Sequence, residues 1–222
     1  MSNIFTPSKD TEFLNPFGPT MGYYKMPPEL VDNLNAGMSE SLNDYSDNLV
    51  GKVKQELEFT EKTKQAALEG LKDFIAQYSN FSEVRNSFGV RRLNSKKYNY
   101  GISIVSGWFV RQYEGEYNPI HLHTGARLSC VGYLSLPDGI EKEWEEDYKD
   151  HHPSHGHIQF VHGTASGYSS TNFLIKPQVG DFYIFPSELF HCVYPFYTKG
   201  ERRSFSMNLN FLEVLKEKSV DK

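Results

Sequence analysis

The chain has 222 residues, of which 38% are hydrophobic and 14% aromatic, and 23 Lys and Arg against 28 Asp and Glu give it a formal net charge of −5. This charge offers no electrostatic reason to expect binding to nucleic acid or to a membrane surface. The chain has no apolar run of transmembrane length, no recognisable signal peptide and only two cysteines. These features predict one cytoplasmic domain over residues 1–222.

The first third of the chain is expected to support a core that lies further along. Residues 1–27 contain four prolines and are predicted to be an irregular lead-in. Residues 28–80 are predicted to be helical, because Pro28 and Glu29 suit a helix start and apolar residues then recur at helical spacing. These apolar residues are Leu30, Val31, Leu34 and Met38, and in a second run Leu49, Val50, Val53, Leu57, Phe59, Ala66, Ala67, Leu71, Phe74 and Ile75.

The character of the sequence changes at about residue 90. Short apolar or aromatic runs follow one another up to residue 212, separated by Gly, Pro, Asn and Asp. Many short strands with turn residues between them are typical of an all-β sandwich or barrel. We therefore predict a β core over residues 90–212, with the helices of residues 28–80 packed on its outer face.

Three histidines in strand-like segments are candidate metal ligands. His121 and His123 are two residues apart, so on a strand both would point to the same face. His191 follows 70 residues after His121, and strands so distant in sequence become neighbours in a rolled-up sheet. A structural pair is the alternative for an isolated His-x-His, but the strand-like flanks of all three residues favour a metal site.

Five further histidines form a second group near the middle of the chain. They could form a second metal site, line the mouth of a substrate site or belong to an exposed polar loop, and we favour the loop. Outside this group, the Asn118-Pro119 pair just before His121 is interpreted as a turn. The five histidines are His151, His152, His155, His157 and His162.

An arginine and a serine near the C-terminus could hold a carboxylate. On a strand, Arg202 and Ser204 share one face, whereas Arg203, Phe205 and Met207 share the other. A guanidinium fork beside a hydroxyl suits a carboxylate ligand. The alternative, which this motif alone would favour, is that both arginines lie at a solvated hairpin end.

The order of these motifs resembles the Fe(II)/2-oxoglutarate-dependent dioxygenase superfamily. The likeness is greatest to a small bacterial and phage branch of oxygenases near the prolyl-hydroxylase type. It extends over about half of the chain, residues 100–211. The segments that carry it are Trp108, residues 115–123 with the His-x-His pair, residues 128–134, residues 177–187 with the later His191, and residues 202–204.

This resemblance implies a double-stranded β-helix, or jelly roll, with flanking helices. It implies Fe(II), 2-oxoglutarate and O₂ as cofactor and cosubstrates, with ascorbate as an optional addition, and no catalytic side chain beyond the metal ligands. It also implies the cytoplasm of a bacterial or phage-infected cell. The site residues that it implies are His121 and His191 for the metal, and Arg202, Ser204 and Tyr133 for 2-oxoglutarate.

His123 stands where the superfamily normally has Asp or Glu. A site of three histidines carries one negative charge fewer and should hold Fe(II) less tightly. The His-x-His form also belongs to the branch that this chain resembles, so His123 is kept as the third ligand.

The expected activity is hydroxylation of a C–H bond in a substrate that the sequence does not identify. A prolyl or other peptidyl residue is favoured, and a small-molecule substrate is the other class. One alternative is a three-His iron oxygenase of cupin type that uses no 2-oxoglutarate, which Arg202 and Ser204 argue against. Another is a non-catalytic jelly-roll binding or structural protein. Neither nucleic acid nor a membrane is expected as a partner, and the sequence leaves the oligomeric state open.

Overall fold

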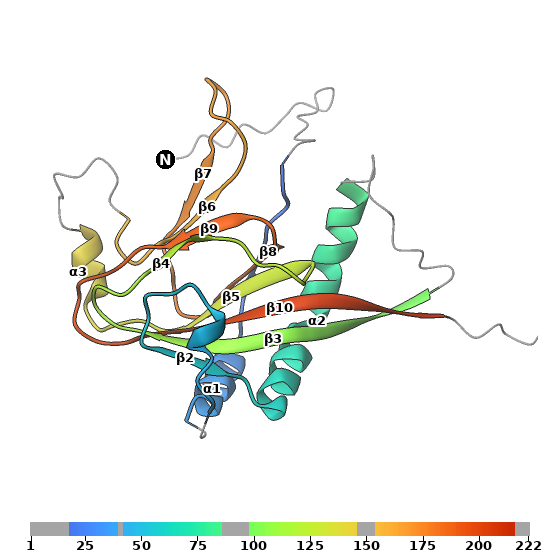
Figure 1. The fold of residues 1–222 in the computed structure, drawn as a ribbon, viewed down its shortest axis with the longest axis horizontal. Helices are drawn as coiled ribbons and strands as arrows, with labels where there is room; N and C mark the ends of the chain where they lie inside the picture. Colours follow the sequence, from blue (N-terminus) through green and yellow to red (C-terminus); the bar gives the residue numbers. More distant parts are fainter. Residues whose placement is uncertain (1–17, 40–41, 86–97, 146–153, 216–222) are drawn as a thin grey trace, which may run out of the picture.

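A computed structural model describes residues 18–39, 42–85, 98–145 and 154–215. Its strands form two antiparallel sheets (Figure 1). The larger sheet has six strands in the order β1 (Gly22–Lys25), β8 (Asp181–Pro186), β5 (Leu128–Ser135), β10 (Arg202–Leu215), β3 (Tyr98–Gln112) and β2 (Gln55–Glu58). The smaller sheet has four, in the order β4 (Asn118–His121), β9 (Phe190–Val193), β6 (Ile158–Val161) and β7 (Asn172–Ile175).

The curled antiparallel sheets confirm the predicted jelly roll with flanking helices. Strands distant in sequence lie side by side, and β10 pairs with β3 on one side and β5 on the other. A short helix, α3 (Ile140–Glu145), follows β5. The predicted start of the β core at residue 90 lies outside the described residues.

Two helices, α1 (Pro28–Gly37) and α2 (Glu61–Arg85), pack against the outer face of the six-stranded sheet (Figure 1). Thr60 caps α2, because its hydroxyl accepts a 3.1 Å hydrogen bond from the backbone N–H of Thr63. The helices bury an apolar stripe that includes Leu34, Leu71 and Ile75, none of which is exposed. This stripe packs in one core with the outer face of β5 and β10, as predicted.

The prediction of helix throughout residues 28–80 is wrong between the two helices. A 3₁₀ turn, η1 (Ser46–Asn48), and strand β2 occupy that interval. Its apolar spacing suited a helix, but β2 instead pairs with the edge of β3. There Leu57 packs against the helix-side core, whereas Glu56 is buried on the opposite face. Tertiary pairing has overridden the local pattern.

The lead-in is also more ordered than expected. Within residues 1–27, which were predicted to be irregular, Gly22–Lys25 forms the edge strand β1 and pairs with β8. No helix in the described parts of the chain combines the length and the apolar character needed to cross a membrane.

Candidate active site

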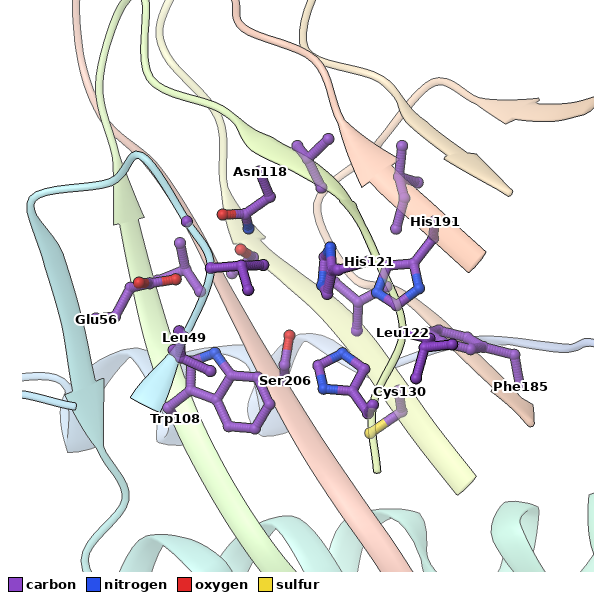
Figure 2. Close-up of a pocket in the computed structure, with 18 of the residues that line it drawn as sticks. Leu49, Glu56, Trp108, Asn118, His121, Leu122, Cys130, Phe185, His191 and Ser206 are labelled. Carbon is purple, nitrogen blue, oxygen red and sulfur yellow. The ribbon is translucent and has the colours of Figure 1, made fainter. Parts of the chain in front are cut away.

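Three histidines meet between the two sheets. The antiparallel register of β4 and β9 places His121 directly opposite His191, and their ring centroids are 4.2 Å apart. Both side chains face into one cavity (Figure 2). This cross-strand pair brings together two residues that are 70 positions apart in the chain.

His123 reaches the same point from just beyond the end of β4. Its backbone N–H donates a 2.9 Å hydrogen bond to the carbonyl of Ser187, which fixes the chain to the turn before β9. Its ring lies 5.1 Å from that of His121 and 5.2 Å from that of His191. The ligand atoms of the three histidines all lie within 4.8 Å of one another. Metal–nitrogen bonds of about 2.1 Å put neighbouring ligand atoms about 3 Å apart, so a small ring movement completes the site.

Backbone carbonyls orient two of the three rings. Nδ1 of His121 lies 2.7 Å from the carbonyl oxygen of Pro119, and Nδ1 of His191 lies 2.9 Å from that of Leu189. In each ring the protonated Nδ1 donates to the carbonyl, so the lone pair of Nε2 is directed at the cavity. This is the usual arrangement around metal-ligating histidines.

Burial keeps the three imidazoles neutral. Loss of hydration lowers the pKa of His123 to about 4 and that of His191 to about 3, and it also lowers the pKa of His121. A neutral imidazole is the form that binds a metal. Within the described residues, these three form the only group of His, Cys, Asp or Glu side chains arranged to hold a metal ion. The donor set fits a divalent first-row ion.

Arg202 lies in the same cavity and is only 2% exposed. Its Nη1 donates a 2.6 Å hydrogen bond to the carbonyl of Gly156, and its Nη2 donates to Oε1 of Gln112. Its Nε is buried without a partner, and no described carboxylate forms an ion pair with it. Burial lowers the pKa of the guanidinium, but an arginine stays charged in proteins. A buried cation of this kind fits an anionic ligand.

Two further groups complete the surroundings of Arg202. The ring of Tyr133 lies 5.8 Å from the guanidinium carbon, and its buried hydroxyl has no hydrogen-bond partner. Burial raises the pKa of this phenol to about 12, so it remains a donor. Ser204 pairs directly with Tyr133 across β10 and β5 and is 4% exposed. The unpartnered donors suit a carboxylate.

The alternation predicted for β10 is present. Arg203 is partly exposed and forms a 3.1 Å ion pair with Glu201, whereas Phe205 and Met207 belong to the core beneath the helices. All six predicted site residues line one cavity of about 110 Å³. They are His121, His123, His191, Tyr133, Arg202 and Ser204.

The second group of histidines forms no second metal cluster among the residues that the structure describes. His155 lies 2.9 Å from a carboxylate oxygen of Glu143, and His157 Nδ1 lies 2.8 Å from the carbonyl of His155. His162 is near a different groove. The predictions for His151 and His152 fall outside the described residues.

The sequence analysis missed two residues that line the cavity and one that holds Arg202 in place. Gln112 holds Arg202, and alternation with Trp108 and Val110 on the same strand was its available signal. Asn118 was interpreted as part of a turn, but it is the first residue of β4 and lines the cavity. Glu56 lay inside a predicted helix, so the sequence offered no signal that would place it here.

The chain is similar to known oxygenases in sequence and in fold. Residues 106–208 match a family model described as "Putative 2OG-Fe(II) oxygenase". No curated protein matches the chain in sequence.

Three solved structures with low sequence identity share the fold. A Pseudomonas putida prolyl-4-hydroxylase is 18% identical, with 87% of this chain and 92% of that chain covered and a TM-score of 0.50. AviO1 from Streptomyces viridochromogenes Tue57 is 11% identical, with 92% of each chain covered and a TM-score of 0.52. A viral collagen prolyl hydroxylase from Paramecium Bursaria Chlorella virus-1 is 12% identical, with 94% of this chain and 98% of that chain covered and a TM-score of 0.50.

Proposed function

We propose that this chain, as a member of the Fe(II)/2-oxoglutarate-dependent oxygenase superfamily, hydroxylates a C–H bond of its substrate. The overall reaction converts substrate, 2-oxoglutarate and O₂ into hydroxylated substrate, succinate and CO₂. When bound, iron and 2-oxoglutarate supply the activation of O₂. The side chains of this protein supply binding, orientation and exclusion of water.

The observation that carries the proposal is the buried Arg202 in the same cavity as the three histidines. Its charge has no ion-pair partner among the described residues, and its Nε and the hydroxyl of Tyr133 are free to donate. We assign these two groups, with Ser204, to the distal carboxylate of 2-oxoglutarate. The three histidines would hold the metal through Nε2 of His121 and His191 and a ring nitrogen of His123.

A prolyl or other peptidyl residue is the substrate class proposed first. Two proteins with the same fold are described as a prolyl-4-hydroxylase and a collagen prolyl hydroxylase. Because these likenesses are below 25% identity, they support the architecture and leave the substrate to experiment.

The direct test is turnover of 2-oxoglutarate to succinate by purified protein reconstituted with Fe(II). We expect succinate to form only when iron, 2-oxoglutarate and O₂ are all present. Consumption of O₂ without 2-oxoglutarate would favour the three-His oxygenase of cupin type. If the protein bound neither metal nor 2-oxoglutarate, the non-catalytic alternative would replace the proposal.

Metal binding can be followed independently of turnover. The ring of Trp108 lies 5.7 Å from that of His123 and is 4% exposed. A paramagnetic ion such as Co(II) at the three histidines should therefore quench Trp108 fluorescence, and His191→Ala should abolish the quenching. Trp144, the other tryptophan, packs on His157 away from this site, so a Trp144→Phe background isolates the signal.

A further inference from the structure

A carboxylate is buried in the cavity with no hydrogen-bond partner for one of its oxygens. Glu56 is 2% exposed, lines the same cavity as the three histidines, and its Oε2 is enclosed without a partner. Burying an unpaired carboxylate is unfavourable by several kcal/mol. A ligand that pairs with this carboxylate would remove the unfavourable free energy of its burial.

A second unpartnered oxygen faces the same small space. Oδ1 of Asn118 is also buried without a hydrogen bond. A Cβ atom added to Gly51 would lie 2.3 Å from this oxygen and 2.9 Å from Oε1 of Glu56. Both side chains thus approach the backbone of Gly51 too closely for a side chain at position 51. All three residues line the cavity, and the part of the cavity beside the two acceptors is called the gap. Figure 2 shows the oxygen of Asn118 on the side of Glu56.

The charge around this gap is negative. Burial raises the pKa of Glu56 to about 7, and the negative charges of Asp44 and Glu116 add to this rise. The carboxylate of Glu116 already accepts hydrogen bonds from the backbone N–H groups of Lys54 and Tyr113. No described cation forms an ion pair with Glu56.

The gap is separate from the proposed 2-oxoglutarate site. One cross-strand row runs along the inner face of the large sheet from Glu56 on β2 through Val110 and Ser204 to Tyr133 on β5. Neighbouring strands are about 4.8 Å apart, so Glu56 and Ser204 stand about 10 Å apart. Arg202 makes one end of the cavity cationic, and Glu56 makes the other anionic.

We propose that Glu56 and Asn118 bind a positively charged nitrogen of the substrate, an ammonium or guanidinium group. This inference rests on the proposed function and deepens it by naming a basic substrate. Two converging acceptors suit a ligand with at least two N–H donors, which a single hydroxyl does not supply. A cation also compensates the buried carboxylate. The substrate's basic group would thus be anchored on one side of the metal site, with 2-oxoglutarate on the other.

Methylguanidinium and its neutral isostere N-methylurea form a matched pair of probes. Each is titrated by NMR into the full chain loaded with Zn(II) and 2-oxoglutarate. We expect methylguanidinium to bind at least tenfold more tightly than N-methylurea, and Glu56→Gln to remove this preference. Glu58→Gln, on the same strand but outside the cavity lining, should retain it. Equal affinity for the two probes, or an unchanged preference in Glu56→Gln, would overturn the inference.

Gly51→Ala tests the same gap without changing the charge. Its methyl group would overlap the oxygen of Asn118 and the carboxylate of Glu56. It should therefore displace both acceptors and weaken methylguanidinium binding at least tenfold, whereas 2-oxoglutarate binding should be unchanged. Unchanged methylguanidinium binding in Gly51→Ala would mean that the cation binds elsewhere. If the proposed function were wrong, the wild-type protein itself would not bind 2-oxoglutarate.

Competition against bound methylguanidinium identifies the source of the basic group. One series consists of proline-containing peptides with Arg, Gln or Glu beside the proline, and the other is the free diamine derivative agmatine. Displacement by the Arg peptide alone identifies a peptidyl substrate, and displacement by agmatine alone identifies a small molecule. Displacement by the Glu peptide as readily as by the Arg peptide would contradict a cation-specific subsite.

Discussion

The two ends of the cavity lie on the same face of one sheet but handle buried charge differently. At one end, two nitrogens of Arg202 donate to Gly156 and Gln112, and its Nε is left over. At the other end, Glu56 has no described donor, and its electrostatic neighbours are acids. The protein thus holds a permanently charged cation in place, whereas the carboxylate can either take up a proton or meet a ligand. This difference suits an anionic cosubstrate at the first end and a variable, cationic substrate at the second.

The largest expected effect is at the cationic end. Arg202→Ala should weaken 2-oxoglutarate binding by about 3–5 kcal/mol, or a factor of hundreds or more, because it leaves a buried carboxylate unpaired. Metal binding, measured by Trp108 quenching, should be nearly unchanged. Arg203→Ala is the matched control, since Arg203 points to the outer surface and pairs with Glu201. The opposite behaviour of the two variants would show that the inward and outward faces of β10 are exchanged.

Protonation of Glu56, at the anionic end, should make the free energy of unfolding depend on pH. The pKa of Glu56 is raised from 4.5 to about 7 in the folded protein. Between these pH values the folded state binds a proton that the unfolded state has released, so this contribution to stability falls as pH rises. At 1.36 kcal/mol per pKa unit, the loss above pH 7 is on the order of 3 kcal/mol.

Glu56→Gln removes that dependence. The variant and the wild type should unfold with similar free energies at pH 4, whereas at pH 8 the variant should be more stable, measured by urea denaturation without metal. The histidines contribute with the opposite sign: their lowered pKa values favour folding above about pH 6.5, and this contribution is lost as pH falls. Taking the difference between variant and wild type at each pH cancels the histidine contribution. A difference that does not change with pH would mean that Glu56 is ionised at little cost.

The three histidines line the same cavity as the two ends, and the affinity of a metal ion bound by them should respond to charge. His123→Asp adds a negative charge at the position where the superfamily normally has an acid. We expect about tenfold tighter Fe(II) binding, roughly 1.4 kcal/mol, in chelator competition. His123→Ala should weaken binding instead. If both variants bound Fe(II) as well as the wild type, His123 would not be a ligand.

The smallest expected effect is at Tyr133, and it differs in sign between two measurements. Tyr133→Phe removes a donor, so 2-oxoglutarate binding should weaken by about 1 kcal/mol. Without ligand, the same change removes a buried hydroxyl that has no partner, so the variant should unfold at an equal or higher temperature. A weaker ligand affinity together with a lower melting temperature would indicate that the hydroxyl is structural.

Short-range periodicity was sufficient for several parts of this protein. Alternation along β10 correctly placed Phe205 and Met207 in the helix-side core and Arg202 and Ser204 on the cavity side. Helical spacing and start signals located α1 and most of α2. These features follow from side-chain directions that repeat within one element, which any single segment specifies by itself.

Only the tertiary structure decided how these segments meet. The pairing of His121 with His191 depends on the register of two strands far apart in the chain, and no local pattern encodes such a register. The interval with Glu56 had apolar spacing suited to a helix, but the free edge of β3 made it a strand and turned Glu56 into the cavity. The sequence by itself thus determined which residue types can bind metal and carboxylate. Packing of two sheets determined which charges are buried together, because burial and electrostatics depend on neighbours that are distant along the chain.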